Sequence, residues 1–290
     1  LSSNLRRPTT FHPPALNRSP HATISIMSWL VLVVLNVLFM SLYMLLQRVL
    51  LKEEQSDPIA HAFVFQFVTA CVFFLYAVIF SEFALPDLRP FVFNLGLMTV
   101  LYVAMNIVMF KAFKVIEASQ VNIFFTTNSI WVMIWSALFL NELITPLRIL
   151  GTVLVVIGVG IVLWRGKLDI RSPGVLYALL AALLFGAAFT NDLYLLPSFD
   201  PSSYLTIAFL FPALGALLVR PSTIKHLSFY ADTQRLLYTY GGEASQISPI
   251  SQSSVILTVI LSYFFLKERD YIVYKLIGSI VIFIGILLIV

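Results

Sequence analysis

Four polar residues lie inside apolar stretches of the chain and could bind a small solute. Asn122 and Thr126 are four positions apart, which places both on one face of a helix. Ser248 and Gln252 repeat this spacing in a later apolar stretch. Their amide and hydroxyl groups supply the neutral donors and acceptors that hold a small polar solute in a binding site. The same residue types also hydrogen-bond membrane helices to one another, so both interpretations stay open here.

Asp192 is a carboxylate near the end of another apolar stretch. An acidic group inside a membrane is costly, and it often marks a site that couples a proton or a cation to function. Asp192 also lies close to Pro197, where its helix is expected to end and where its carboxylate could reach water. The sequence leaves both interpretations open.

Residue patterns typical of enzymes and metal sites are missing from the sequence. The four histidines are scattered, none has a second ligand at metal-binding spacing, and no Gly-x-Ser-x-Gly motif occurs. The single cysteine, Cys71, excludes an intramolecular disulfide and is expected to be a small buried residue. We therefore expect no enzymatic activity, no metal and no cofactor.

The composition indicates a membrane protein. Of 290 residues, 60% are hydrophobic and only 11% are charged, and the mean hydropathy is +0.95. So little charge on so much apolar mass requires the lipid bilayer as the solvent. The formal net charge of +4 does not indicate a nucleic-acid partner, because the basic residues lie at the ends of apolar stretches, beside the expected lipid headgroups.

The apolar stretches predict an all-α protein with several membrane-spanning helices. A bilayer core of about 30 Å needs a helix of about 20 apolar residues, and these stretches show no strand-like alternation. Nine helices are expected: Ser28–Gln47, Pro58–Ser81, Pro90–Phe110, Ala118–Leu140, Ile149–Trp164, Gly174–Tyr194, Ser202–Val219, Ala244–Leu266 and Tyr271–Val290. Residues 1–26, rich in proline and polar residues, are expected to be a disordered leader, with Met27 as the native start.

A duplication organises these helices into two halves. Glu117-Ala118-Ser119-Gln120-Val121 recurs 126 positions later as Glu-Ala-Ser-Gln-Ile over residues 243–247. Glycines at positions 151 and 158 recur similarly at 278 and 285, where they are expected to allow close helix packing, together with Gly160. We expect one repeat of five helices over residues 27–165 and a second over residues 172–290.

The second half is short of one helix. Asp57-Pro58 recurs as Asp200-Pro201 at an offset of 143, so 17 residues are missing between there and the later motif. The deficit falls on the eighth helix, where residues 221–240 hold charged groups that disfavour a lipid-facing span. The basic residues of the loops nevertheless fit ten crossings by the positive-inside rule, with Met27 outside and the halves inverted.

The repeated motif, the Phe-Leu-x-Glu ends at Glu142 and Glu268 and the glycine-rich fifth and tenth helices resemble the EamA-like permeases of the drug/metabolite transporter superfamily. The resemblance covers Met27 to Val290. It implies inverted five-helix repeats in a bacterial cytoplasmic membrane and ATP-independent export or exchange of amino acids or other small organic molecules. The shortened eighth helix departs from the family's pattern.

We therefore expect a secondary transporter with Asn122, Thr126, Ser248 and Gln252 as solute contacts and Asp192 as a coupling residue. Its expected partners are a small-molecule substrate and the lipid bilayer. A truncated transporter that is inactive, or active only as a homodimer supplying the missing helix, is the first alternative. A membrane-embedded enzyme that modifies a lipid or sugar phosphate is the second.

Overall fold

The described part of the chain is a bundle of helices. The computed structural model describes residues 26–52, 56–165, 170–223, 254–266 and 271–289. These residues form helices and no strand, in agreement with the all-α prediction. The main helices are α1 (Ile26–Lys52), α2 (Pro58–Phe80), α3 (Val92–Val115), α4 (Ala118–Phe125), α5 (Asn128–Phe139), α6 (Pro146–Arg165), α7 (Pro173–Leu195), α8 (Pro201–Val219), α11 (Ser254–Leu261) and α12 (Ile272–Ile289).

Among the described residues, six segments are long and apolar enough to cross a membrane: Pro58–Phe80, Arg89–Val115, Ala118–Phe139, Pro146–Trp164, Pro173–Ser198 and Pro201–Val219. Shorter apolar stretches, Leu38–Leu51 and Ile272–Ile286, lie in α1 and α12. The protein is therefore an integral, multi-pass membrane protein. Three parts of the prediction lie outside the described residues: residues 1–25 of the expected leader (1–26), residues 224–240 of the expected eighth-helix segment (221–240), and residues 244–253 of the expected ninth helix.

Three of the described helices start at an Asp-Pro or Ser-Pro pair, and the sequence predicts the two Asp-Pro starts. Asp57 Oδ1 accepts a hydrogen bond from the Ile59 N–H (3.0 Å) at the start of α2. Asp200 Oδ2 accepts one from the Ser203 N–H (2.9 Å) at the start of α8, and Ser172 caps α7 through the Val175 N–H (3.5 Å). Proline is favoured at the first helical position because its fixed φ suits a helix and its missing N–H would have no partner there.

The expected fourth helix is divided in two. The structure interrupts it at Thr126 and Thr127, between α4 and α5, where the Thr127 N–H donates to the Phe124 carbonyl (3.2 Å) in a tightened turn. Hydroxyl groups also donate to carbonyl oxygens here, Thr126 to Ile123 (2.5 Å) and Thr127 to Phe124 (2.7 Å). Backbone groups freed inside a membrane helix need such partners, so the Thr-Thr pair stabilises the interruption.

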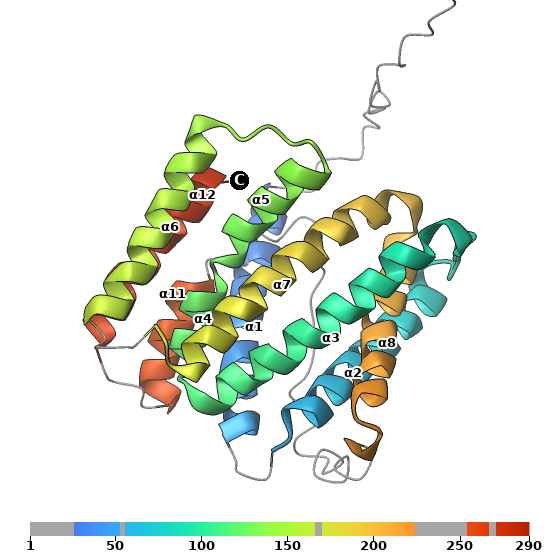
Figure 1. Cartoon of the computed structure of the whole chain (residues 1–290), viewed down its shortest axis with the longest axis horizontal. Coiled ribbons are helices and arrows are strands. Elements are labelled where there is room, and N and C mark those ends of the chain that lie inside the picture. Colours follow the sequence, from blue (N-terminus) through green and yellow to red (C-terminus); the bar gives the residue numbers. More distant parts are fainter. Residues whose placement is uncertain (1–25, 53–55, 166–169, 224–253, 267–270, 290) are drawn as a thin grey trace, which may run out of the picture.

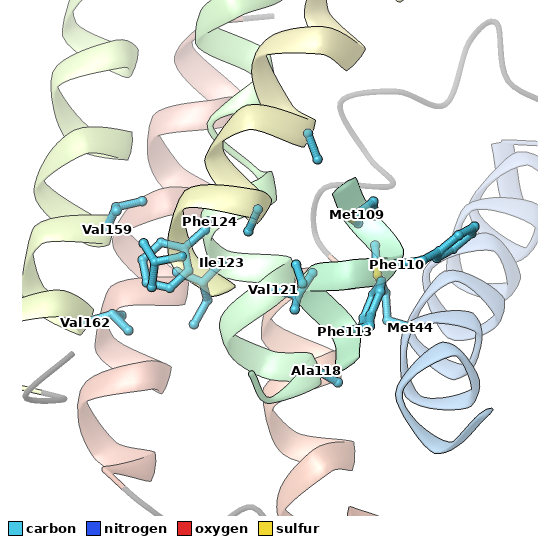
Figure 2. Close-up of a cluster of buried hydrophobic side chains, with 14 of the residues drawn as sticks. Met44, Met109, Phe110, Phe113, Ala118, Val121, Ile123, Phe124, Val159 and Val162 are labelled. Atoms are coloured by element: carbon cyan, nitrogen blue, oxygen red, sulfur yellow. The ribbon is translucent and has the colours of Figure 1, made fainter. Parts of the chain in front are cut away.

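Helices from the two expected halves pack in pairs (Figure 1). Helix α6 lies along α12, α2 along α8, and α3 along α7. Helix α1 packs against α11, while α4 and α5 pack against α7. A buried apolar core lies among these helices, and Figure 2 shows Met44 of α1 near Phe113 of α3, and Val159 of α6 near Phe124 of α4. Because lipid is as apolar as this core, close packing and hydrogen bonds hold the helices together.

Glycines bring α6 and α12 into backbone contact. A Cβ atom added to Gly158 would lie 2.7 Å from the Gly278 carbonyl oxygen, and one added to Gly285 would lie 2.6 Å from the Gly151 carbonyl oxygen. The close packing expected for these glycines is confirmed. Gly160 differs, because a Cβ atom there would meet nothing within 4 Å. Cys71 also departs from expectation: it is exposed on α2 rather than buried, so it faces outward from the bundle.

Candidate functional site

The carboxylate of Asp192 lies between two tyrosine hydroxyls. Tyr204 of α8 donates to Oδ1 (2.7 Å), and Tyr102 of α3 donates to Oδ2 (2.5 Å). Asp192 is on α7, so its side chain joins three helices. The expectation that it could simply reach water at a helix end is incomplete, since protein hydroxyls occupy both oxygens. Hydrogen bonds to a charged carboxylate are among the strongest in proteins and offset part of the cost of its desolvation.

The helix starts and the neighbouring aromatic rings orient these tyrosines. Tyr204 is the fourth residue of α8, one turn after the capping residue Asp200, and its side chain is 2% exposed. Its ring packs on Phe199 with a centroid separation of 5.4 Å, and the ring of Tyr102 meets Phe185 edge-on at 6.4 Å. Two χ angles fix a tyrosine hydroxyl, so rings held by packing keep the two donors aimed at the carboxylate.

A second polar contact lies beside this one. Asn191, the neighbour of Asp192, accepts a hydrogen bond from Asn94 Nδ2 (2.8 Å) and donates to the Asn94 carbonyl (3.1 Å). Helices α3 and α7 are therefore joined twice near the same end. Side-chain hydrogen bonds of this kind link membrane helices to one another. Below, Asp192 with Tyr102 and Tyr204 is called the carboxylate cluster.

The capping residue Asp200 has its own polar surroundings. The Ser202 hydroxyl donates to Oδ2 (2.5 Å), and the Ser203 N–H donates to the same oxygen (2.9 Å). These hydrogen bonds, that of Ser202 first, hold the pKa of Asp200 below its ordinary value of 3.8 because they stabilise the charged form. Asp200 is therefore a structural cap that keeps Tyr204 in register with Asp192.

The two described residues of the expected solute site lie one turn apart, Asn122 on α4 and Thr126 directly after its last residue. Asn122 is 2% exposed and Thr126 is fully buried. The Thr126 N–H donates to the Asn122 carbonyl (3.0 Å), and the Thr126 hydroxyl bonds the Ile123 carbonyl, so this hydroxyl stabilises the helix interruption. Ser248 and Gln252, the expected partners from the second half, lie outside the described residues.

The side chain of Asn122 carries a hydrogen-bond donor that the described residues leave unused. Its Nδ2 is buried and has no hydrogen-bond partner among the described residues. Thr258 of α11, a helix that packs on α4, has a buried hydroxyl in the same condition. A buried polar group without a partner costs about 1–3 kcal/mol, so such groups are candidates for contact with a bound molecule.

The carboxylate cluster and Asn122 are distinct. No hydrogen bond joins Asp192 with Asn122 or Thr126 in the part of the chain that the structure describes, although α4 and α7 pack together. The sequence did not single out Tyr102 and Tyr204, since tyrosines are common in membrane proteins, above all at the membrane–water interfaces. The described residues contain no group of three or more His, Cys, Asp or Glu side chains that could hold a metal ion.

Comparison with known families identifies the first half of the chain. Residues 27–164 match the model of the EamA-like transporter family. This family belongs to the drug/metabolite transporter superfamily, and its members are transporters rather than enzymes. No curated protein matches the chain.

Proposed function

We propose that the chain is a secondary transporter of small organic metabolites or amino acids, because residues 27–164 match the model of the EamA-like transporter family. It exports or exchanges its solute without ATP, in a bacterial cytoplasmic membrane. Six long apolar helices among the described residues are compatible with this proposal. The proposed mechanism is alternating access, in which two halves rock around a site near the middle of the membrane.

The packing pairs support two related halves. If the helices are numbered by the expected repeat, α6 and α12 are the fifth and tenth, and α2 and α8 are the second and seventh. Each pair thus joins equivalent helices. The contact of the first helix, α1, with the ninth, α11, is mirrored by the contact of the sixth, α7, with the fourth, α4 and α5. A two-fold relation between inverted repeats produces this pattern of pairs.

The observation that carries the proposal is the unpaired amide of Asn122 beside an interrupted helix. Transporter sites are commonly built where a membrane helix is discontinuous, because polar groups are available there without a packed partner. Asn122 Nδ2 lacks a hydrogen-bond partner among the described residues, and the interruption at Thr126 begins one turn away. We assign Asn122 and Thr126, with Ser248 and Gln252 of the second half, to the solute site.

Asp192 is the proposed coupling residue. Its two tyrosine partners hold a carboxylate inside the membrane. A carboxyl group that gains and loses a proton there could couple solute transport to a proton gradient. It is also joined to three helices, so a change in its charge would alter how α3, α7 and α8 pack. This gives a physical link between protonation and a change of conformation.

The function is tested by transport into liposomes that contain the purified full-length protein. A mixture of amino acids and small metabolites is supplied outside, and mass spectrometry identifies which of them enter. We expect a small set to enter faster than in protein-free liposomes, without ATP. Entry of none, or chemical conversion of an added lipid or sugar phosphate in their place, would contradict the proposal.

The two-repeat design is tested separately by topology. Reporter proteins are placed before Met27 and after Val290, and the side of the membrane on which each lies is determined. Ten crossings place both ends on one side. Ends on opposite sides would mean an odd number of crossings, and the halves could not be inverted copies with five helices each.

A further inference from the structure

We propose that the buried ion pair between Glu117 and Lys275, supported by the ion pair between Asp57 and Arg220, is a gate that closes one end of the transporter. This inference rests on the proposed function, because a gate has meaning only in a protein that opens alternately to its two sides. The two pairs are the salt bridges that join the expected halves among the described residues. In each pair the acid comes from the first half and the base from the second.

Glu117 and Lys275 meet at the starts of two helices. Glu117 directly precedes α4, and Lys275 lies in the first turn of α12. Lys275 Nζ donates to Glu117 Oε2, and the side chains are 2% and 22% exposed respectively. A lysine this deeply buried is stable as a cation only beside a negative partner. The same glutamate opens the repeated motif, so the contact joins that motif in the first half to the last helix of the second.

Asp57 and Arg220 form the second link. Asp57 caps the start of α2, Arg220 ends α8, and Arg220 Nη2 lies 2.6 Å from Asp57 Oδ2. The arginine side chain is 40% exposed, so water and salt weaken this pair relative to the buried one. It therefore supports the gate, and Glu117 with Lys275 dominates it.

Both ion pairs lie at the same end of the bundle. Lys114, three residues before Glu117, donates from Nζ to the carbonyl of Ser56, the neighbour of Asp57 (2.7 Å). The loop charges predict that this end faces the cytoplasm. At the other end the polar contacts between the halves among the described residues are hydrogen bonds, including the Ala84 N–H to Ser203 Oγ (3.1 Å) and the carboxylate cluster. They lie beside apolar packing, such as that of Phe91 on Phe199. The two ends are thus closed by different chemistry.

The energetics explain why a buried ion pair can act as a gate. With the halves together, each charge has its partner in a medium of low dielectric constant, where the attraction is strong. When the halves separate at this end, water solvates both charges and replaces the pair. Removing one charge leaves the other buried without compensation in the closed state only, so the population shifts toward the open state.

The test measures how fast a maleimide reaches a cysteine behind the gate. Val121 is fully buried on α4 and lies one turn beyond Glu117, on the same face. Figure 2 shows Val121 on α4 among the buried side chains. Val121→Cys is made in a full-length Cys71→Ser background, because Cys71 is exposed. Labelling is compared in the parent and in Glu117→Gln, Lys275→Gln and the exchanged pair Glu117→Lys with Lys275→Glu.

We expect each single variant to raise the labelling rate about tenfold or more, and the exchanged pair to return it to within about twofold of the parent. A control cysteine at Val155, fully buried where α6 meets α12, reports general unfolding and should stay protected in every variant. Unchanged labelling in the single variants, or an exchanged pair that labels as fast as they do, would overturn the gate. Equal rises at both cysteines would also overturn it, since loss of packing would then explain the result.

The outcomes separate this inference from the proposed function. Solute transport with unchanged labelling in both single variants would leave a transporter without this gate. Faster labelling in the single variants with restored protection in the exchanged pair, in a protein that transports none of the offered solutes, would overturn the transport proposal. The coupling between Glu117 and Lys275 would still stand.

Discussion

The carboxylate of Asp192 accepts a hydrogen bond of 2.7 Å from the hydroxyl of Tyr204, twelve positions later in the chain. The two residues lie on neighbouring helices, α7 and α8, and Tyr102 of α3 donates to the other carboxylate oxygen. Protonation of the carboxyl group would remove the charge that makes both hydrogen bonds strong. The packing of three helices is therefore linked to the charge of one side chain.

Replacing Asp192 by Asn tests this link. The amide cannot carry the coupled proton, so we expect Asp192→Asn to lower solute accumulation driven by a pH gradient about tenfold or more. Exchange of solute in the absence of a gradient should persist, since exchange needs no net proton movement. Both are measured in proteoliposomes.

The matched control for Asp192 is Asp87→Asn, an aspartate in an exposed turn that accepts a hydrogen bond from the Arg89 N–H (3.1 Å). It should leave gradient-driven accumulation unchanged. If Asp192→Asn accumulates solute as well as the parent, Asp192 is a structural link between helices and another group couples transport.

Asn122 and Thr126 should separate solute binding from stability. Asn122→Leu removes a buried amide nitrogen without a partner among the described residues, so the midpoint of thermal unfolding should stay the same or rise. Its KM for the transported solute should rise about tenfold, the loss expected for one hydrogen bond to the solute.

Thr126→Val is the matched comparison for Asn122→Leu. It removes the hydroxyl that bonds the Ile123 carbonyl, so stability should fall by about 1 kcal/mol. Thermal unfolding in detergent and transport kinetics give the two readouts. A lower unfolding temperature with normal KM for Asn122→Leu would show that the amide holds helices together and does not bind solute.

Two glycines one helical half-turn apart should respond differently to the same change. Gly158→Ala places a methyl group 2.7 Å from the Gly278 carbonyl oxygen, so α6 and α12 must separate, at a cost of about 1–3 kcal/mol. Gly160→Ala meets nothing within 4 Å and should be neutral or slightly stabilising. Equal unfolding temperatures for the two variants would contradict the close contact of these helices.

The stability contributed by Asp200 should depend on pH. Hydrogen bonds hold its folded pKa below 3.8, so its contribution is complete above the unfolded value and is lost as pH falls through the lowered folded value. Asp200→Asn keeps a side chain that can cap α8 but cannot titrate. Between about pH 5 and pH 2, the unfolding temperature of the parent should fall further than that of this variant. An equal decrease in the unfolding temperature of both proteins would show that Asp200 does not contribute to the loss of stability in acid.

The helix boundaries were predictable where the sequence carries a local signal. Asp57-Pro58, Ser172-Pro173 and Asp200-Pro201 start helices because a capping side chain and a proline act within one turn. The glycine contacts of α6 and α12 also followed from spacing, but Gly160 was included wrongly, since a shared stripe does not say which face touches the partner helix.

The site was predictable only in part. Asn122 and Asp192 were noticed because a polar group in an apolar stretch is costly. Tyr102 and Tyr204 could not be assigned, because nothing local indicates that residues 90 positions and 12 positions away donate to one carboxylate. The interruption at Thr126 was also missed, since two threonines in an apolar stretch carry neither the proline nor the glycine that usually marks a break.

Counterflow tests the central claim, alternating access by a secondary transporter, most directly. Proteoliposomes are loaded with a high concentration of an unlabelled solute from the transport screen and placed in a trace of the labelled form. The account predicts that label accumulates inside above its outside concentration for a time, driven only by exit of unlabelled solute. Label that merely equilibrates, at the same rate with or without trapped solute, would contradict alternating access and indicate a passive pore.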